Sequence, residues 1–472
     1  MSSKVKQLNV TDESRSAAKT IVLLAWPVLL EQIFTTLVSF ADTAMVGSLG
    51  AGATAAVSIS NSPIFLLNGI IMSLGVGITA LVARATGAGN TELVRKLMRH
   101  AILVLLYIGL PMAVVIISLY RMIPLWMGAG PEILDAAATY NLIVSLGRPF
   151  MIASMILNSA FRGYGDTKTP MILNLVMNLV NVVFNFLLIY PTRELTVLGY
   201  TFTMYGAGWG VAGAAAATAL GMILAGTMAF YVAFRKSNPY RVSFVEKGSI
   251  LPDKALSKQI FSISLPAMLE RICMSSSGIL VTSSVATLGT ANIAANSLAL
   301  SAESLSYMPA FAFQMAITTL VGQSLGANKP KLAEKFVKTT QAMGFAVMCF
   351  TGLGLYVFAE PILGVFTPDT EVIFLAAQCL RLMGIIQPPQ LMAWVYGGAL
   401  RGAGDTKSVF YISAFTNWAI RTLFSVLAIR AWGLGLYSVF VVMSVEIFIR
   451  LALLFLRYRS GKWKNTLQAI ET

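Results

Sequence analysis

The chain has 472 residues, of which 57% are hydrophobic and only 11% are charged. A soluble domain carries about a quarter charged residues, so this composition excludes a protein whose main solvent is water. The net charge of +14 would suggest a nucleic-acid partner in a soluble protein. In a membrane protein the informative quantity is the distribution of Lys and Arg among the loops, and we expect no nucleic-acid partner.

Apolar stretches long enough to cross a bilayer, about 20 residues each, recur from Ile21 to the end of the chain. They predict an all-α integral membrane protein with twelve transmembrane helices, near residues 20–46, 53–82, 97–120, 136–159, 168–190, 209–234, 259–287, 293–322, 336–359, 373–398, 408–430 and 435–456. Residues 1–19 are charged and lack the apolar core of a signal peptide. We therefore expect cytoplasmic tails over 1–19 and 457–472.

Basic residues alternate between the loops. The even-numbered loops and both tails hold nearly all of the 34 Lys and Arg, whereas the odd-numbered loops hold only Arg121, Arg193 and Arg430. Because basic residues stay on the cytoplasmic side, this alternation predicts a multi-pass protein with both termini in the cytoplasm. The compact chain favours the bacterial inner (plasma) membrane.

The second half of the chain repeats the first at an offset of 239 residues, the separation of Arg162 from Arg401. The clearest match is residues 162–168 (RGYGDTK) against 401–407 (RGAGDTK). Six spans in each half, both starting inside, predict parallel repeats with a substrate path in the cleft between them. The expected lobes are 20–235 and 259–456, with a cytoplasmic linker over 236–258. The outer loop from Thr192 to Tyr205 is an insertion in the first half.

Several motifs together resemble the multidrug and toxic compound extrusion (MATE) family of cation-coupled antiporters. They lie at residues 40–47 (FADTAMVG), 84–89 (RATGAG), 162–168, 294–296 (AAN), 322–327 (GQSLGA) and 401–407. The resemblance covers about residues 20 to 455 and implies export of amphipathic, often cationic compounds in exchange for H⁺ or Na⁺. It implies no cofactor. Small-molecule substrates and the lipid bilayer are the expected partners, and we expect a monomer.

Three other functions compete with this interpretation. A lipid-linked precursor flippase of related fold would need a larger basic cleft. A major-facilitator transporter would carry Asp-Arg and Gly-Arg-Arg signals in its second-to-third loop, which this sequence lacks. A membrane enzyme would need a set of catalytic residues. The sequence offers none, since it has one histidine, no metal-ligand spacing and no phosphate-binding loop.

Asp42 is the acid that the resemblance assigns to cation coupling. In the fifth span Asn174, Asn178, Asn181 and Asn185 recur at spacings of four, three and four, which places their amides on one helical stripe. Amide oxygens can coordinate Na⁺ or hydrogen-bond a carboxylate. We therefore predict a cation-coupling site at Asp42, Asn178, Asn181 and Asn185, with Na⁺ as a candidate metal at Asp42, Asn181 and Asn185. The alternatives are a structural acid and amides that only join helices.

Three further carboxylates inside predicted spans, Glu31, Glu270 and Glu303, are candidates for substrate or cation binding. An ionisable side chain deep in a bilayer costs at least about 2.5 to 3.5 kcal/mol, so each needs a partner or a function. The structural alternative for Glu270 is an ion pair with Arg271 or Arg381. Some relatives carry an acid in the tenth span, where this chain has Gln387 and Gln390.

The remaining polar residues of the spans have simpler interpretations. Glu446 and Arg450 are four residues apart and are expected to pair with each other. Arg148 and Arg421 stay unassigned. Cys273, Cys349 and Cys379 are expected to be buried small side chains, and His100 to lie at the membrane interface. Pro27 and Pro266 are expected bend points.

Overall fold

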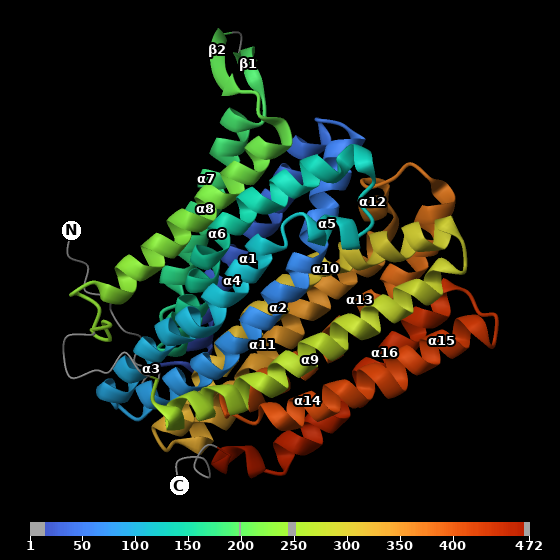
Figure 1. Ribbon diagram of the computed structural model, residues 1–472. Helices are drawn as coiled ribbons and strands as arrows, with labels where there is room; N and C mark the ends of the chain where they lie inside the picture. The colour runs from blue at the N-terminus through green and yellow to red at the C-terminus, as the bar shows by residue number, and fades with distance from the viewer. Residues whose placement is uncertain (1–14, 198–199, 244–251, 467–472) are drawn as a thin grey trace.

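The computed structural model describes residues 15–197, 200–243 and 252–466, and Figure 1 shows them as a bundle of long helices. The first repeat consists of α1 (Ala17–Gly47), α2 (Ala51–Gly87), α3 (Thr91–Val104), η1 (Leu105–Gly109), α4 (Leu110–Ser118), α5 (Met122–Trp126), α6 (Pro131–Gly163), α7 (Lys168–Leu188) and α8 (Gly210–Phe234). The second consists of α9 (Lys254–Ala286), α10 (Thr290–Gly326), α11 (Pro330–Val357), α12 (Ala359–Gly364), α13 (Thr370–Gly402), α14 (Thr406–Phe415), η2 (Thr416–Thr422), α15 (Leu423–Arg430), α16 (Leu436–Arg459) and η3 (Lys462–Asn465).

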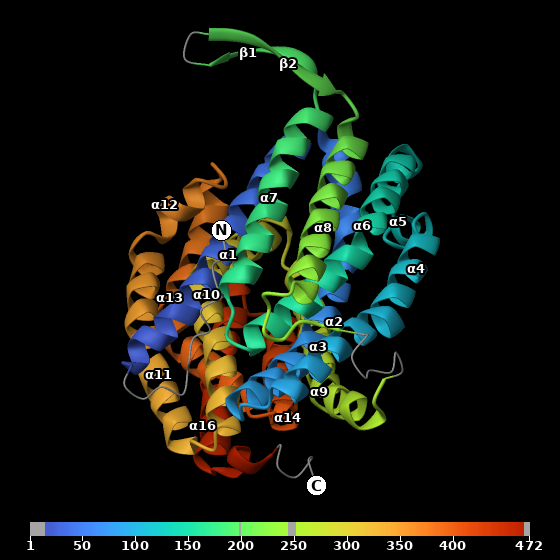
Figure 2. The same cartoon turned by 90° about the vertical axis from the view of Figure 1, so that its left-hand side faces the viewer.

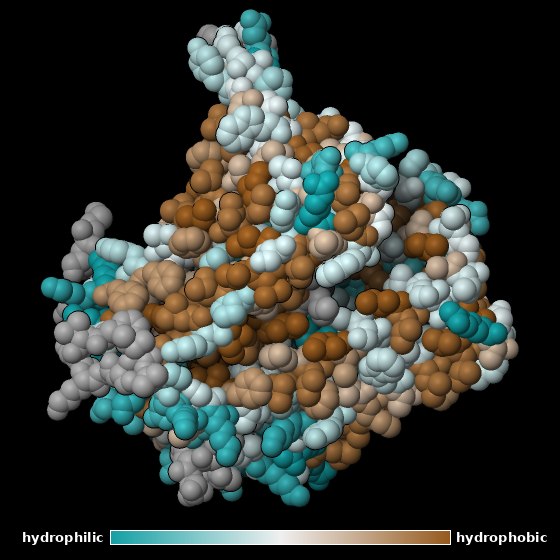
Figure 3. All heavy atoms as spheres, viewed as in Figure 1, coloured by the Kyte–Doolittle hydropathy of each residue, from teal (hydrophilic) through white to brown (hydrophobic). Residues whose placement is uncertain are grey.

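The helices confirm the predicted all-α membrane architecture of two six-helix repeats. Among the described residues, 11 helical segments are long and apolar enough to span a membrane. The predicted span that is not among these 11 is α9, the seventh in chain order. It is 33 residues long, but it is rich in serine and carries Lys254, Lys258, Glu270 and Arg271. Hydrophobic residues cover the middle of the bundle on the face shown in Figure 3, and hydrophilic residues gather towards its ends.

The two ends of the bundle differ in composition. The "basic face" is the end at which α1, α3, α7, α9, α11 and α14 begin, and it carries Lys96, Lys254, Lys331 and Lys407. The opposite end is the "hairpin face", because β1 (Pro191–Val197) and β2 (Tyr200–Ala207) project from it between α7 and α8 (Figures 1 and 2). The sequence identified this segment as an inserted loop but not as a hairpin. Its Thr, Val and aromatic residues favour strands.

The first helix of each repeat is held by both repeats. Near the basic face, Ile21, Leu24 and Val28 of α1 lie in the hydrophobic core of α10, α11 and α13, whereas Val46 at its other end packs with α6 and α8. The same exchange recurs in α9, where Ile260 and Ile263 join the core of α2 and α3. Pro27 and Pro266 lie inside these helices, close to the point where the partner changes.

Hydrogen bonds from side chains to backbone carbonyls join the two repeats at the basic face. Thr319 Oγ1 donates to the Arg162 carbonyl at 3.0 Å, and Gln323 Nε2 donates to the Gly163 carbonyl at 2.9 Å. Glycine permits the close approach of α2 and α10: a Cβ added at Gly87 would lie 1.9 Å from the Gln323 carbonyl oxygen, and one at Gly326 would lie 2.0 Å from the Arg84 carbonyl oxygen. Any larger residue at either position would separate the helices.

Parts of some predictions lie outside the described residues. These parts are residues 1–14 and 467–472 of the tails and 244–251 of the linker. One prediction is wrong in part: Cys379 is buried, but Cys273 is only half-buried and Cys349 is exposed on α11. The hydrophobic pattern could not distinguish a helix face directed at the bundle from one directed at lipid, because both are apolar.

Replacing Gly326 by alanine is expected to force the repeats apart at the basic face, because the new methyl group would overlap the Arg84 carbonyl. Spin labels introduced by Glu92→Cys on α3 and Lys331→Cys on α11, in a cysteine-free background, allow their separation to be measured by double electron–electron resonance. The distance distribution should shift to longer values in Gly326→Ala. The matched control is Gly354→Ala on α11, which has open space around its Cβ position and should leave the distribution unchanged. An unshifted Gly326→Ala distribution would contradict the tight contact.

Candidate cation-coupling site

Helices α1 and α7 run side by side in the same direction with a constant register. Asn174 Nδ2 donates to Glu31 Oε1 at 2.6 Å, and Asn178 Nδ2 donates to Thr35 Oγ1 at 3.3 Å. Asn185 Nδ2 donates to Asp42 Oδ1 at 2.5 Å. Each of these pairs is separated by 143 residues, so the asparagine stripe faces a single stripe of α1. The structure thus brings the predicted amides together with both acids of α1.

Asp42 lies at the hairpin-face end of this seam, in contact with two amides. Asn181 satisfies its hydrogen bonds when its amide nitrogen faces the carboxylate, donating to Oδ1 and Oδ2 of Asp42 at 2.8 and 3.0 Å. In that orientation its oxygen accepts from Thr218 Oγ1 on α8 at 3.1 Å. Asn181 and Asn185 are buried, whereas Asp42 is half-buried. The carboxylate is therefore fixed on one side and accessible on the other.

Asp42 differs from the other membrane carboxylates in its partners. Within the described ranges no Lys, Arg or His forms an ion pair with it, although Tyr140 of α6 lies nearby. The buried Arg148, which the sequence left unassigned, lies close to Tyr140. Asn185 Oδ1 is buried and has no hydrogen-bond partner among those residues. A carboxylate and an amide oxygen are oxygen ligands of the kind that a hard cation such as Na⁺ prefers, and a carboxylate can alternatively exchange a proton.

Glu31 forms a buried ion pair with a residue that the sequence had not connected to it. Arg162 Nη2 donates to Oε1 and Oε2 of Glu31 at 2.6 and 2.9 Å. The side chains are 7% (Glu31) and 14% (Arg162) exposed, so the pair is shielded from solvent. With Asn174 also donating, the charge of Glu31 is fully compensated.

Glu270 repeats this arrangement in the second half. Arg401 Nη2 donates to its two oxygens at 2.8 and 2.9 Å, and Ser413 Oγ donates at 2.8 Å. Each of these residues lies 239 positions after its counterpart in the first repeat: Glu31, Arg162 and Asn174. The predicted alternative partner Arg381 was wrong, because Glu270 pairs with Arg401 and Arg381 pairs with Glu360 at 2.8 Å.

The Asp42 cluster has no such copy. The positions that correspond to Asp42, Asn181 and Asn185 hold the apolar residues Val281, Ile420 and Phe424. Val281 is 5% exposed and packs in the core of α10, α13 and α16. The duplication therefore preserved the charge pairs next to the prolines, whereas the single-copy carboxylate exists only in the first repeat.

Glu303 belongs to a separate polar cluster inside the second repeat. It is fully buried on α10 and accepts a hydrogen bond from Gln387 Nε2 at 3.3 Å, while Ser306 Oγ donates to Gln387 Oε1 at 2.8 Å. Arg421, in the π-helical turn η2, lies near Glu303 and Glu446. The predicted pair of Glu446 and Arg450 is confirmed at 2.5 Å.

The three predicted substrate or cation ligands thus lie in three separate contacts. Glu31 and Glu270 each have an arginine partner, and Glu303 is enclosed within α10 and α13. Their function in binding stays a prediction, as does that of Asn178, which hydrogen-bonds Thr35. No group of three or more His, Cys, Asp or Glu residues suited to a metal ion occurs within residues 15–197, 200–243 and 252–466.

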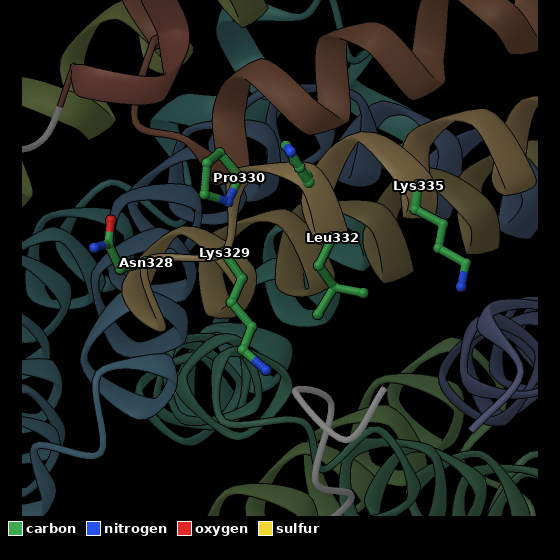
Figure 4. A pocket seen from close by; sticks show the side chains of 6 residues that line it. Asn328, Lys329, Pro330, Leu332 and Lys335 are labelled. Atoms are coloured by element: carbon green, nitrogen blue, oxygen red, sulfur yellow. The ribbon is translucent and has the colours of Figure 1, made fainter. Parts of the chain in front are cut away.

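A hollow of about 450 Å³ lies away from these acids, at the basic face, where α10 joins α11. It is lined by Asn328, Lys329, Pro330, Lys331, Leu332 and Lys335. Figure 4 shows Lys329 and Lys335 extending to the same side of the start of α11. Its three lysines favour an anion over a cation.

Comparison with known proteins identifies the family. A sequence model of the MatE family matches the chain twice, over residues 27–187 and 266–427. The chain belongs to the MatE family. As a member of this family it is a multi-pass membrane transporter and not an enzyme. One match lies in each repeat, and together they confirm both the duplication and the resemblance seen in the sequence.

Relatives of this MatE protein match over most of their length. A probable multidrug resistance protein NorM of Thermotoga maritima is 26% identical over 454 residues, which cover 96% of this chain and 95% of the relative. A probable NorM of Mannheimia succiniciproducens is 30% identical over 413 residues, which cover 86% of this chain and 85% of the relative. A solved structure, described as the outward-facing conformation of a multidrug resistance MATE family transporter, has a TM-score of 0.86 at 22% identity, covering 98% of this chain and 100% of the other.

Sequence reasoning missed Arg162 and Arg401, which it assigned to a turn motif and to loop charge. A usable signal existed. Each arginine follows its acid by 131 residues in both repeats, and the acid and the arginine recur together at the common offset. Thr218 and Tyr140 gave no comparable signal, because single Thr and Tyr residues are frequent on transmembrane helices.

Neutralising one member of the Glu31–Arg162 pair is expected to destabilise this MatE protein more than neutralising both. Glu31→Gln or Arg162→Gln leaves an uncompensated buried charge, which costs about 3 to 5 kcal/mol. The double variant should lose far less than the sum of the two single losses. Chemical unfolding of the detergent-solubilised protein measures each free energy of unfolding.

The control for this cycle is the exposed pair of Arg121 and Asp135, whose side chains are 56% and 84% exposed. Arg121→Gln and Asp135→Asn should each change the free energy of unfolding by less than about 1 kcal/mol. Additive losses in the Glu31 and Arg162 cycle would show that the two charges do not compensate each other.

Proposed function

We propose that this protein exports amphipathic cationic compounds in exchange for H⁺ or Na⁺, and that Asp42 is the residue at which the ion and the compound compete. The observation that carries the proposal is the single-copy carboxylate of α1, held by Asn181 and Asn185 and lacking an arginine partner in the described residues. The relatives named as multidrug resistance proteins support the class of substrate.

Electrostatics explain why such a site would exchange cations. A lone carboxylate in a membrane segment is costly, by about 2.5 kcal/mol or more, and the cost falls when a cation neutralises it. The two amides stabilise the ionised form between binding events. A proton, Na⁺ or a cationic compound each neutralises Asp42, so occupancy by one excludes the others. Exchange follows from this competition.

The orientation of the molecule completes the proposed cycle. The basic face and both termini lie on the cytoplasmic side of the inner membrane, because Lys and Arg are retained on the cytoplasmic side. The repeats touch at this face, so the hairpin face is the side from which H⁺ or Na⁺ reaches Asp42 and displaces the compound. Neutral Asp42 then permits return to the state open to the cytoplasm. The ion must bind the two states with different affinity for this to occur.

Bending of α1 at Pro27 would link Asp42 to that change. The segment of α1 before Pro27 packs on the second repeat, and the segment after it follows α7 through the asparagine stripe. Relative motion of the repeats therefore changes the geometry between these two segments. Proline supplies the weak point, because it removes one backbone hydrogen bond of the helix.

Asp42→Asn is expected to abolish ion-driven transport. Ethidium transport is measured in proteoliposomes under an imposed H⁺ gradient and, separately, under an imposed Na⁺ gradient. One of the two gradients should accelerate transport by wild type at least about tenfold, which corresponds to about 1.4 kcal/mol in activation free energy. Asp42→Asn keeps the shape of the side chain but removes its charge, and should show no acceleration.

The control variant is Asp135→Asn, an exposed acid of α6 paired with Arg121. It should transport like wild type. Acceleration that persists in Asp42→Asn would contradict coupling at Asp42 and would assign it to Glu270 or Glu303, each tested by its Gln variant. Wild-type transport that responds to neither gradient would contradict antiport itself.

A further inference from the structure

A second hollow, of about 360 Å³, lies between the repeats close to the basic face, away from Asp42. It is lined by Leu74, His100, Leu103, Val104, Tyr107, Ile108, Pro252, Ser257, Lys258, Ile260 and Phe261. Apart from Pro252, which precedes α9, these residues belong to α2, α3 and η1 of the first repeat and to the start of α9 of the second. The volume is within the range of small-molecule pockets, about 300 to 1,000 Å³.

The residues at the bottom of this hollow are buried, and those at its rim are exposed. Leu74, Leu103 and Ile260 are buried, whereas Tyr107 and Phe261 are exposed. His100 fixes the two walls to each other: one ring nitrogen, Nδ1, lies 2.9 Å from the Lys96 carbonyl, and the other, Nε2, accepts from the Asp253 backbone N–H at 3.0 Å. The hollow is thus an open groove with fixed walls.

The wall formed by α3 and η1 is a mainly apolar stripe along one side of the helix. His100, Leu103, Val104 and Tyr107 recur at spacings of three, four and seven, so they form one stripe of the helix. From His100 to Ile108 the stripe extends for about 12 Å, from the basic face towards the middle of the membrane. The turn that carries Tyr107 and Ile108 is the π-helical segment η1, and such turns are frequent at functional sites.

Charge is concentrated at one end of the groove. Among the residues that the structure describes, Lys258 is the only Lys or Arg that lines it, and none of the described carboxylates lines it. In the part of the chain that the structure describes, Lys258 has no ion-pair partner. Two acids at the starts of α3 and α9 have other partners: Glu92 pairs with Lys96 at 3.1 Å, and Asp253 Oδ1 caps α9 by accepting from the Ala255 N–H at 2.8 Å. Ser257 adds a hydroxyl beside Lys258.

We infer that this groove is a binding site for one anionic phospholipid of the leaflet at the basic face, with the headgroup phosphate on Lys258 and an acyl chain along Leu103, Val104 and Tyr107. A phospholipid matches both halves of the site: an anion at the interface and an apolar chain that extends into the membrane. Basic pockets between transmembrane helices on this side of a bilayer bind anionic headgroups. Lys258 disfavours the cationic compounds proposed for Asp42.

The position of the groove gives the lipid a structural effect. Its walls come from α3 of the first repeat and α9 of the second, close to the contacts of Ser73 Oγ with the Ala267 carbonyl and of Ser264 Oγ with the Leu74 carbonyl, at 3.3 and 3.1 Å. A lipid that touches both walls stabilises the arrangement in which the repeats meet at this face.

The test uses the full chain in phosphatidylcholine nanodiscs. Tyr107→Trp places a fluorescent reporter on the rim of the groove, and phosphatidylglycerol or phosphatidylcholine with brominated acyl chains serves as the quencher. The signal of the parent protein is subtracted. Brominated phosphatidylglycerol should reach half-maximal quenching at about a fivefold lower mole fraction than brominated phosphatidylcholine, since one lysine near the surface contributes about fivefold.

Variants of Lys258 decide the assignment. Lys258→Gln in the Tyr107→Trp background should reduce the selectivity for phosphatidylglycerol to about onefold, and Lys258→Arg, which retains the charge, should keep it. The matched control is Lys407→Gln, another exposed lysine of the basic face, which should also keep it. Two results would contradict the proposed lipid site: equal quenching by the two lipids in the Tyr107→Trp protein that retains Lys258, or selectivity for phosphatidylglycerol that persists after Lys258→Gln.

Discussion

The first helix of each repeat is shared between the two repeats, and this exchange constrains the whole molecule. The beginning of α1 lies in the core of the second repeat, whereas its remainder follows α7 of the first; α9 does the reverse. Pro27 and Pro266 lie next to the changeover. The repeats therefore cannot move relative to each other without deforming both helices where a backbone hydrogen bond is already missing.

The membrane carboxylates of α1 and α9 differ in the partners that stabilise their charge. Glu31 and Glu270 lie one turn beyond the two prolines, and each is compensated by an arginine from the end of the fourth or tenth span. The same ion pair occurs once in each repeat, at equivalent positions, so it is a feature that the two halves share. Asp42 occurs in the first repeat alone, and its hydrogen-bond partners among the described residues are amides, so its charge is stabilised there but not neutralised. The cost of a membrane carboxylate without a cationic partner is the basis of the cation binding proposed for Asp42.

The sequence predicted the spans and the polar stripe of α7 because each depends on periodicity along one segment, and it revealed the duplication because motifs recur at one constant offset. The Asn stripe needed only its four positions to be placed on one side of a helix. Contacts between distant helices were harder. Arg162 was not connected to Glu31, Arg381 was wrongly offered to Glu270, and exposed Cys349 was expected to be buried, because helix rotation and neighbour identity are set by packing of the whole bundle. The hairpin of residues 191–207 was recognised as an insertion, but its strand pairing was not predicted.

Direct competition at Asp42 is the central claim, and the number of ions released when a cation binds tests it most directly. Ethidium is added to the purified protein in weakly buffered detergent solution, with and without Na⁺, and released protons are followed with a pH-indicator dye. The account predicts either proton release by wild type or loss of ethidium affinity as Na⁺ increases, and neither effect in Asp42→Asn. The same release, or the same Na⁺ dependence, in wild type and Asp42→Asn would contradict it.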